Sequence, residues 1–240
     1  MSYQKKVYRF RNAVEVEEYH SARYGNPGEA RKEKAKPTPE QMAARNQWNK
    51  EKRCRHRLRE YFQVNDYFVT LTYRKEERPE DMEEAKQHFR KFIGKVRKEY
   101  RKRGHELRWI RNIEVGTKGA WHIHMAVNRI QDTDLILSMA WPYGYTDIKL
   151  LRKFREFAEL AAYLTKTPRT DSKLREADYN CSRNMPLKEP EIKTYKRWKT
   201  WKEPKVPKGW YLDKDSMMEG INPVSGYPFR RYTYLRVMRQ

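Results

Sequence analysis

The sequence predicts an α+β protein in which an antiparallel sheet packs on helices. The first observation is the segment 67–73, which consists almost wholly of β-branched and aromatic residues and therefore predicts a strand inside a sheet. The second is the segment 79–103, a predicted helix that Gly104 ends, with apolar residues at the i, i+3, i+4, i+7 spacing of one buried face. The residues of that face are Phe89, Phe92, Ile93 and Val96.

The third observation is a predicted β-hairpin. Two short apolar segments, 107–115 and 120–127, are separated by Gly116-Thr117-Lys118-Gly119, which is typical of a hairpin turn. Three more elements are predicted to follow: a short helix over 133–140, a strand near 145–150, and a helix over 153–167 that Pro168 ends.

Composition predicts one folded domain with basic extensions at both ends. Residues 1–30 are polar and lack a sustained period, so we expect an irregular lead-in. Residues 31–63 predict a basic helix, with Thr38 as its N-cap and Pro39 at its first position. The domain itself is predicted over 64–168, and residues 169–240 are expected to form an irregular, basic, aromatic-rich extension.

The charge of the chain restricts its partners. Its 240 residues include 54 Lys and Arg against 32 Asp and Glu, a net charge of +22, which favours a polyanion such as nucleic acid. A membrane-spanning protein is not expected, because no window approaches the roughly 18 apolar residues of a spanning helix. A membrane partner is not expected either, because no amphipathic anchor or lipidation motif is visible. The chain shows no secretory signal, and Cys54 and Cys181 are isolated, so we expect a reducing compartment and the cytoplasm.

Four arginines in the predicted basic helix are candidates for contact with the DNA backbone. These arginines do not share one narrow face, so they would surround the helix. Contact with phosphates is one interpretation, and a helix whose charges only face solvent is an equally good one. These residues are Arg53, Arg55, Arg57 and Arg59.

The C-terminal extension interleaves basic residues with large aromatic ones. Such a pattern suits stacking on unpaired bases, but the same aromatics can simply pin the extension to the folded domain. The aromatic residues in question are Tyr195, Trp198, Trp201 and Trp210.

Two histidines in the second hairpin strand predict a metal site. Because side chains alternate along a strand, His122 and His124 share one face, opposite the apolar residues, and can bind a divalent ion together. If the loop has three residues, with Gly119 left-handed, Glu114 lies directly across from His122 and supplies a third ligand. A four-residue loop would turn Glu114 toward the core. Thr70 and Thr72 would present hydroxyls beside the site, and we expect both to contact DNA.

The helix 153–167 supplies the other half of the predicted site. Tyr163 and Lys166 lie on a face apart from the buried stripe. A tyrosine there can attack a metal-polarised phosphorus, and a lysine one turn later can stabilise the developing negative charge. The stripe consists of Phe157, Leu160, Ala161 and Leu164.

Three segments, in this order, resemble the motifs of the HUH endonuclease superfamily: Phe68-Val69-Thr70-Leu71-Thr72-Tyr73, His122-Ile123-His124 and Tyr163-Leu164-Thr165-Lys166. More specifically, residues 64–168 resemble rolling-circle replication initiators of phages and plasmids, of the ORF2/gene II protein type. This resemblance implies a ferredoxin-like or RRM-like catalytic sheet. It further implies Mg²⁺ or Mn²⁺ bound by His122 and His124, with Glu114 as the weaker third match.

The resemblance also implies Tyr163 as the nucleophile and Lys166 as a residue that assists it. A second catalytic tyrosine would stand where this chain has Thr167, so we expect one. The implied function is a site-specific single-stranded DNA endonuclease and strand transferase that initiates rolling-circle replication at an origin. Its tyrosine attack would leave a 5′-phosphotyrosine and a free 3′-OH for a host polymerase. Because no helicase P-loop is present, a host helicase would unwind the duplex.

Three alternatives remain open at this point. The domain can be a ferredoxin-like module that binds nucleic acid without catalysis, in which case Tyr163 is dispensable. It can be a metal-dependent hydrolase that uses activated water and forms no covalent adduct. A relaxase or a transposase would use the same tyrosine chemistry, and the active-site residues do not distinguish these from a replication initiator.

Overall fold

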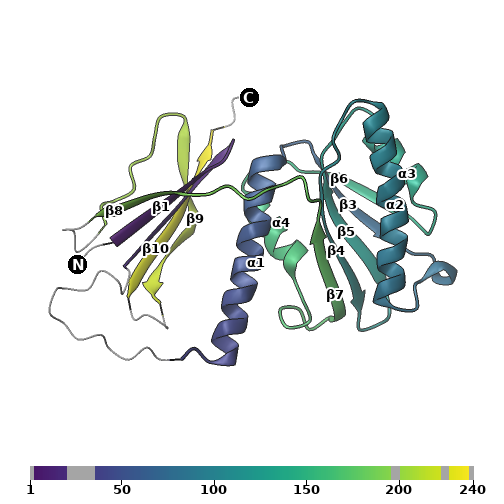
Figure 1. Ribbon diagram of the computed structural model, residues 1–240, viewed down its shortest axis with the longest axis horizontal. Coiled ribbons are helices and arrows are strands. Elements are labelled where there is room, and N and C mark those ends of the chain that lie inside the picture. The colour runs from purple at the N-terminus through teal and green to yellow at the C-terminus, as the bar shows by residue number, and fades with distance from the viewer. Residues whose placement is uncertain (1–2, 21–35, 196–200, 223–226, 238–240) are drawn as a thin grey trace. The chain divides into compact units, whose positions relative to one another are not determined.

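The computed structural model describes residues 3–20, 36–195, 201–222 and 227–237. The chain forms two compact units, the first made of Met1–Asn49 with Leu187–Gln240 and the second of Lys50–Pro186. Each unit contains a five-stranded antiparallel sheet (Figure 1). The predicted α+β class is therefore confirmed, in a form consistent with the HUH endonuclease fold.

The second unit is a sheet with helices on both faces. Helices α2 and α3 cover one face of the sheet and α4 lies on the other (Figure 1). Its strand order is β6-β3-β5-β4-β7, so β3, the strand predicted from 67–73, is paired on both sides. The strands are β3 (Tyr67–Thr72), β4 (Trp109–Gly116), β5 (Trp121–Val127), β6 (Thr146–Leu150) and β7 (Leu174–Cys181). The helices are α2 (Met82–Lys102), α3 (Thr133–Ala140) and α4 (Glu156–Thr165), after a 3-10 turn at Lys75–Glu77.

Two apolar cores hold this sheet between its helices. The predicted stripe of α2 is buried against Ile113 and Ile123 of the sheet. On the other face, the predicted stripe of α4 is buried with Leu58 and Ile110. Both helical stripes are confirmed, and they leave the polar face of β5 turned toward α4.

The hairpin between β4 and β5 has the predicted three-residue loop. Gly119 adopts a left-handed φ of 74°, which glycine accepts without steric cost. The amide of Gly116 donates to the Ala120 carbonyl at 2.9 Å. Glu114 is consequently the direct cross-strand partner of His122.

Strand β7 was not predicted, because residues 169–240 were expected to be irregular. Residues 174–181 instead pair with β4 at the edge of the sheet. Their sequence, LREADYNC, has one buried residue and lacks a clean alternation, since an edge strand needs only part of one face to be apolar. Pairing with β4 supplies the backbone hydrogen bonds that make this segment a strand.

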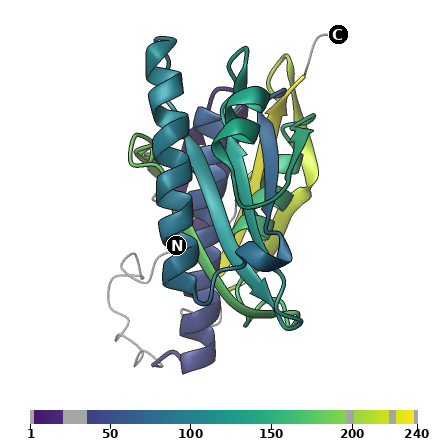
Figure 2. The same cartoon turned by 90° about the vertical axis from the view of Figure 1, so that its right-hand side faces the viewer.

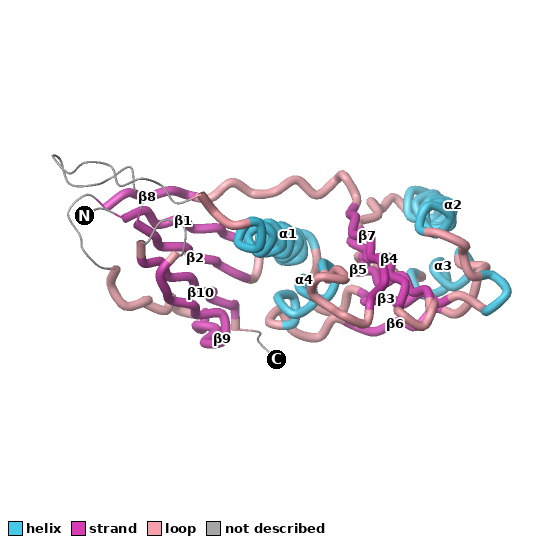
Figure 3. The backbone as a smooth tube through the Cα atoms, turned by 90° about the horizontal axis from the view of Figure 1, so that it is seen from below, coloured by secondary structure: helices cyan, strands magenta, loops and turns pink. Residues whose placement is uncertain are grey.

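The first unit corrects the prediction of irregular extensions at both ends. Its strand order is β8-β1-β2-β10-β9, so segments from the two ends of the chain pair in one sheet (Figure 3). Strands β1 and β2 fall within residues 1–30, and the others fall within 169–240. They are β1 (Tyr3–Arg9), β2 (Ala13–His20), β8 (Glu191–Tyr195), β9 (Trp210–Ile221) and β10 (Pro228–Arg236).

Charged residues stabilise this sheet from inside, which is why its strands look polar in the sequence. Arg230 of β10 is 2% exposed and pairs with the equally buried Glu18 of β2 at 2.7 Å. Lys5 reaches the same carboxylate at 3.2 Å. Because Glu18 and Arg230 are more than 200 residues apart, the sequence pattern shows no local sign of their pairing.

The aromatic residues of the extension contact protein in this unit. Tyr195 stacks on Tyr3 with ring centroids 4.8 Å apart, and Trp201 meets Tyr3 edge-on. These contacts are with β1 of the first unit and not with the domain predicted over 64–168, so neither of the two interpretations is tested by them. Trp198 lies outside the described residues.

Helix α1 (Pro39–Tyr61) begins as predicted. The hydroxyl of Thr38 accepts a hydrogen bond from the Gln41 amide, and the Gln41 side chain accepts one from the Thr38 amide. This reciprocal pair is a capping box. Residues 31–35 of the predicted helix lie outside the described residues. No helix in the described part of the chain is long and apolar enough to cross a membrane.

Gly144 is expected to be indispensable to the second unit. A Cβ at this position would lie 2.0 Å from the Thr72 carbonyl oxygen, so backbone must move to accommodate it. We expect Gly144→Ala to lower the free energy of unfolding by about 2 kcal/mol. In the matched control, Gly94→Ala in α2, a Cβ meets nothing within 4 Å.

Because alanine favours a helix more than glycine does, Gly94→Ala should raise the free energy of unfolding by about 0.5–1 kcal/mol. Urea denaturation of both variants measures the difference. Equal stabilities would show that the β3–Gly144 approach is not tight in solution.

Candidate metal centre and active site

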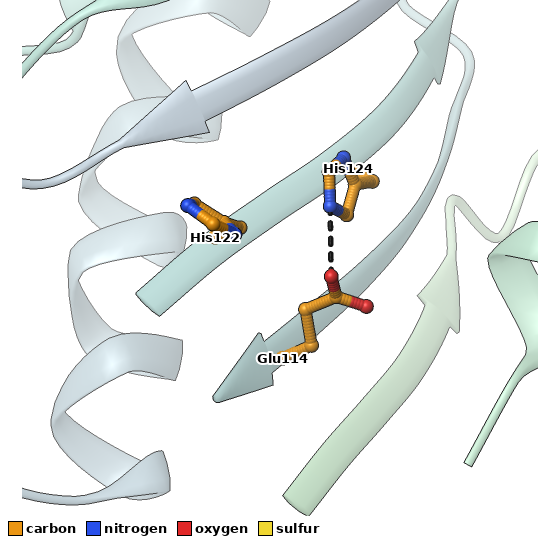
Figure 4. A group of neighbouring side chains, drawn as sticks. All are labelled: Glu114, His122 and His124. Atoms are coloured by element: carbon orange, nitrogen blue, oxygen red, sulfur yellow. Dashed lines mark hydrogen bonds and ion pairs between the residues drawn. The ribbon is translucent and has the colours of Figure 1, made fainter. Parts of the chain in front are cut away.

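One carboxylate and two imidazoles gather on the α4 side of the second unit. Glu114 extends from β4, and His122 and His124 from the neighbouring β5 (Figure 4). One ligand atom from each lies within 4.8 Å of the others. Glu114 and His124 are buried, and His122 is half-buried. Cross-strand pairing therefore makes a group that can hold a metal ion, as the hairpin register predicted.

The surroundings of Glu114 and His122 favour the protonation states that bind metal ions. Burial raises the pKa of Glu114, but hydrogen bonds from His124 and Lys166 outweigh it and bring that pKa below its usual value. Burial, together with the neighbouring His124, lowers the pKa of His122. An ionised carboxylate and a neutral imidazole are the forms that bind metal ions.

Tyr163 of α4 reaches into the cluster. Its hydroxyl lies 3.0 Å from His124 Nε2, the atom that also lies 2.9 Å from Glu114 Oε1. The tyrosine side chain is 38% exposed, so a substrate can reach it. Burial of the phenol raises the pKa of Tyr163, which means that it needs activation before it can act as a nucleophile at neutral pH.

Lys166 lies just past the end of α4 instead of within it, because the helix stops at Thr165 and Lys166 has extended backbone. Its ammonium pairs with Glu114 Oε2 at 2.9 Å and lies 4.2 Å from the centre of the Tyr163 ring. Burial lowers the pKa of Lys166, but the hydrogen bond and charge of Glu114 raise it further, so the net shift is upward. The site thus contains a fixed positive charge beside the tyrosine.

The two threonines of β3 lie beside the histidines, as predicted. Thr70 pairs with His124 across the sheet and Thr72 with His122. The Thr70 hydroxyl is 3.1 Å from His124 Nδ1, whereas the Thr72 hydroxyl is directed to the Tyr145 carbonyl at 3.4 Å. Thr70 therefore contacts His124 at Nδ1, the ring nitrogen that does not face Glu114.

Asn112 is a residue of the site that the prediction did not include. It is completely buried, faces the same side of β4 as Glu114, and is the direct partner of His124. Its amide nitrogen donates to the Lys166 carbonyl at 3.4 Å, and its oxygen has no hydrogen-bond partner among the described residues. Its position two residues before Glu114 on the same strand face is the signal that identifies it.

The predicted DNA-contact arginines of α1 differ in their surroundings. Arg53 is exposed, whereas Arg55 pairs with Glu51 at 3.7 Å. Arg57 donates to the Met185 carbonyl at 3.1 Å, and Arg59 is buried. Arg53 is the member of the set most open to a phosphate, and the DNA contact of all four stays a prediction.

The residues of this site fall within a segment that matches a known protein family. Residues 66–168, which include His122, His124, Tyr163 and Lys166, match the family described as replication-associated protein of the ORF2/gene II protein type. The match covers less than half of the chain, and over that segment the chain is similar to the ORF2/gene II protein family. No curated protein and no solved structure matches the chain.

The match of this segment supports a role for this protein in the initiation of DNA replication, as in phages and plasmids, and implies that it binds DNA. The ORF2/gene II segment ends at residue 168, before β7. Strand β7 and the sheet of the first unit are thus features of this chain beyond the matched segment.

Proposed function

We propose that this protein is a site-specific single-stranded DNA endonuclease and strand transferase that initiates rolling-circle replication. The Tyr163 oxygen forms a bond to the phosphorus of a phosphodiester, and the bond from phosphorus to the 3′ oxygen breaks. Tyr163 loses its phenolic proton and the 3′ oxygen gains one. The products are a 5′-phosphotyrosine and a free 3′-OH, and the reverse reaction with a second 3′-OH joins strands.

One observation carries this proposal: an accessible tyrosine hydroxyl lies 3.0 Å from a histidine of a Glu/His/His cluster. A tyrosine with only a structural role would not need a carboxylate, two imidazoles and an ammonium around it. Lys166 is placed to stabilise negative charge that develops on the phosphate or the leaving oxygen.

The residues present fit a divalent cation. Glu114, His122 and His124 offer a carboxylate and two imidazoles whose ligand atoms lie within 4.8 Å of one another, a donor set that suits a divalent cation. We propose that Glu114, His122 and His124 hold Mg²⁺ or Mn²⁺. Such an ion supplies Lewis acidity toward a phosphate oxygen.

The proposed partner is single-stranded DNA at a replication origin. A host DNA polymerase would extend the 3′-OH, and a host helicase would unwind the duplex. Plasmid mobilisation and transposition use the same chemistry, so a relaxase or transposase role is the alternative that the site residues equally support.

The test is to trap the covalent product. The full chain is incubated with Mn²⁺ and a diverse pool of labelled single-stranded oligonucleotides, then analysed on a denaturing gel and by mass spectrometry. The expected result is an adduct on Tyr163 that disappears with chelator, and the trapped strand reports the cleaved sequence. Cleavage without an adduct would indicate a hydrolase instead, and retention without cleavage would indicate a binding module.

Thr70 is expected to position His124 for the metal. When His124 Nδ1–H donates to the Thr70 hydroxyl, Nε2 keeps its lone pair for an ion. We expect Thr70→Val, which preserves the shape and the strand propensity of the residue, to weaken Mn²⁺ binding by about 10-fold to 100-fold in calorimetry. Thr72→Val is the matched control, because its hydroxyl contacts a carbonyl and no imidazole. Equal affinities for the two variants would remove this role from Thr70.

A further inference from the structure

A groove of about 680 Å³ lies between α2 and β7 in the second unit, and we call it the α2–β7 groove. It is on the sheet face opposite the metal centre, because Trp109 of β4 packs against Phe89 of α2 while Glu114 of the same strand faces the other way. Helix α2 crosses the near side of the sheet in Figure 2. The lining includes Arg97, Arg101, His105, Trp109, Arg183 and Asn184.

The groove carries uncompensated positive charge. In the described part of the chain, Arg97, Arg101 and Arg183 have no side-chain hydrogen bond and no carboxylate partner. Glu106, the acid that lines the groove, is already paired with Arg108 at 2.8 Å. By contrast, Arg103, which directly follows α2, is bound by both Glu99 and Asp132.

Hydrogen bonds hold the wall of the groove in place. The Ser182 amide donates to the Trp109 carbonyl at 2.9 Å, and the Trp109 amide donates to the Ser182 hydroxyl at 3.2 Å. The Asn184 side chain donates to the Leu107 carbonyl. The backbone that carries Arg183 is therefore held in place, which lowers the entropy cost of binding an anion there.

The chemistry of the lining favours phosphates over bases. Trp109 is 7% exposed, so it offers no open ring face on which a base can stack. Guanidiniums match phosphate geometry with paired N–H donors.

We propose that the α2–β7 groove binds the phosphodiester backbone of DNA that flanks the cleaved site. The proposal rests on the DNA-binding role of the family, and it does not require Tyr163 chemistry. The few nucleotides at Tyr163 lie on the other face of the sheet, so the groove holds a different stretch of the same DNA. Residues 180–184 lie beyond the matched family segment, which makes this contact a property of this chain.

The experiment compares two triple variants of the full chain that lose the same charge. One is Arg97→Gln, Arg101→Gln and Arg183→Gln. The control is Lys91→Gln, Lys95→Gln and Lys98→Gln, three exposed lysines of α2 that do not line the groove. Equilibrium binding to a single strand and to a duplex of the same sequence is measured as a function of salt concentration.

The expected result is a decrease of about 2 to 3 in the slope of log K against log salt for the arginine variant, and less than about 1 for the control. The form of DNA that shows the larger decrease identifies whether the groove holds a single strand or a duplex. Equal decreases in the two variants would overturn the proposal. Adduct formation with a short saturating oligonucleotide should survive in both, so a failure of the groove and a failure of the nuclease are distinguishable.

Discussion

Tyr163→Phe is expected to reduce formation of the DNA adduct by about 10³-fold or more. The substitution removes the oxygen that would bond to phosphorus and leaves the ring, which meets His124 edge-on at 5.0 Å and Phe68 at 5.9 Å. Folding should be preserved, because the hydroxyl is partly exposed and a lost hydrogen bond costs only about 1 kcal/mol. A denaturing gel with labelled single-stranded DNA and Mn²⁺ measures the adduct.

Tyr145→Phe is the matched control, since Tyr145 is 76% exposed and belongs to the same unit. It should form the adduct at the wild-type rate. DNA binding by Tyr163→Phe should also remain close to wild type. An adduct that persists in Tyr163→Phe would assign the nucleophile to another residue and refute the proposed chemistry.

His124→Ala is expected to weaken Mn²⁺ binding strongly and to abolish cleavage. Nε2 of His124 is the atom that both Glu114 and Tyr163 approach, so its removal separates the carboxylate from the tyrosine. Loss of a directly ligating residue should weaken the ion by about 100-fold or more, beyond the loss expected from an outer residue. Titration calorimetry with Mn²⁺ measures the affinity, and the gel assay measures cleavage.

His105→Ala serves as the control, because His105 is exposed on the loop after α2 and outside the cluster. It should leave the Mn²⁺ affinity unchanged. Undiminished Mn²⁺ binding by His124→Ala would place the ion elsewhere. Retained binding with lost cleavage would instead show that His124 acts on Tyr163 and not on the metal.

Local patterns were sufficient to predict most of the second unit. The spacing of apolar residues in α2 identifies its buried face, because side chains return to the same side of a helix about every 3.6 residues whatever packs against it. The loop chemistry at Gly119 determined the register of β4 and β5, and the register placed Glu114 opposite His122. Each of these inferences needs only neighbours that are close in the sequence.

The incorrect predictions concern strands whose pairing partners are distant in the sequence. Strand β1 pairs with β8, and β2 with β10, between the two ends of the chain. Their charged side chains, such as Glu18 and Arg230, look like solvent-exposed residues until the partner is known. Asn112 was missed for a related reason, because its burial depends on the end of α4 lying across the sheet.

By itself, the sequence determined the type of the main helices and strands between residues 64 and 168, the three-residue hairpin and the residues that share a strand face with His122. These follow from side-chain alternation, helical period and the left-handed tolerance of glycine, all of which are local. The tertiary structure alone decided that Tyr163 reaches His124, that Lys166 pairs with Glu114, and that both ends of the chain form a second sheet. Those contacts depend on how separate elements pack, and packing is a property of surfaces that come together only in the folded chain.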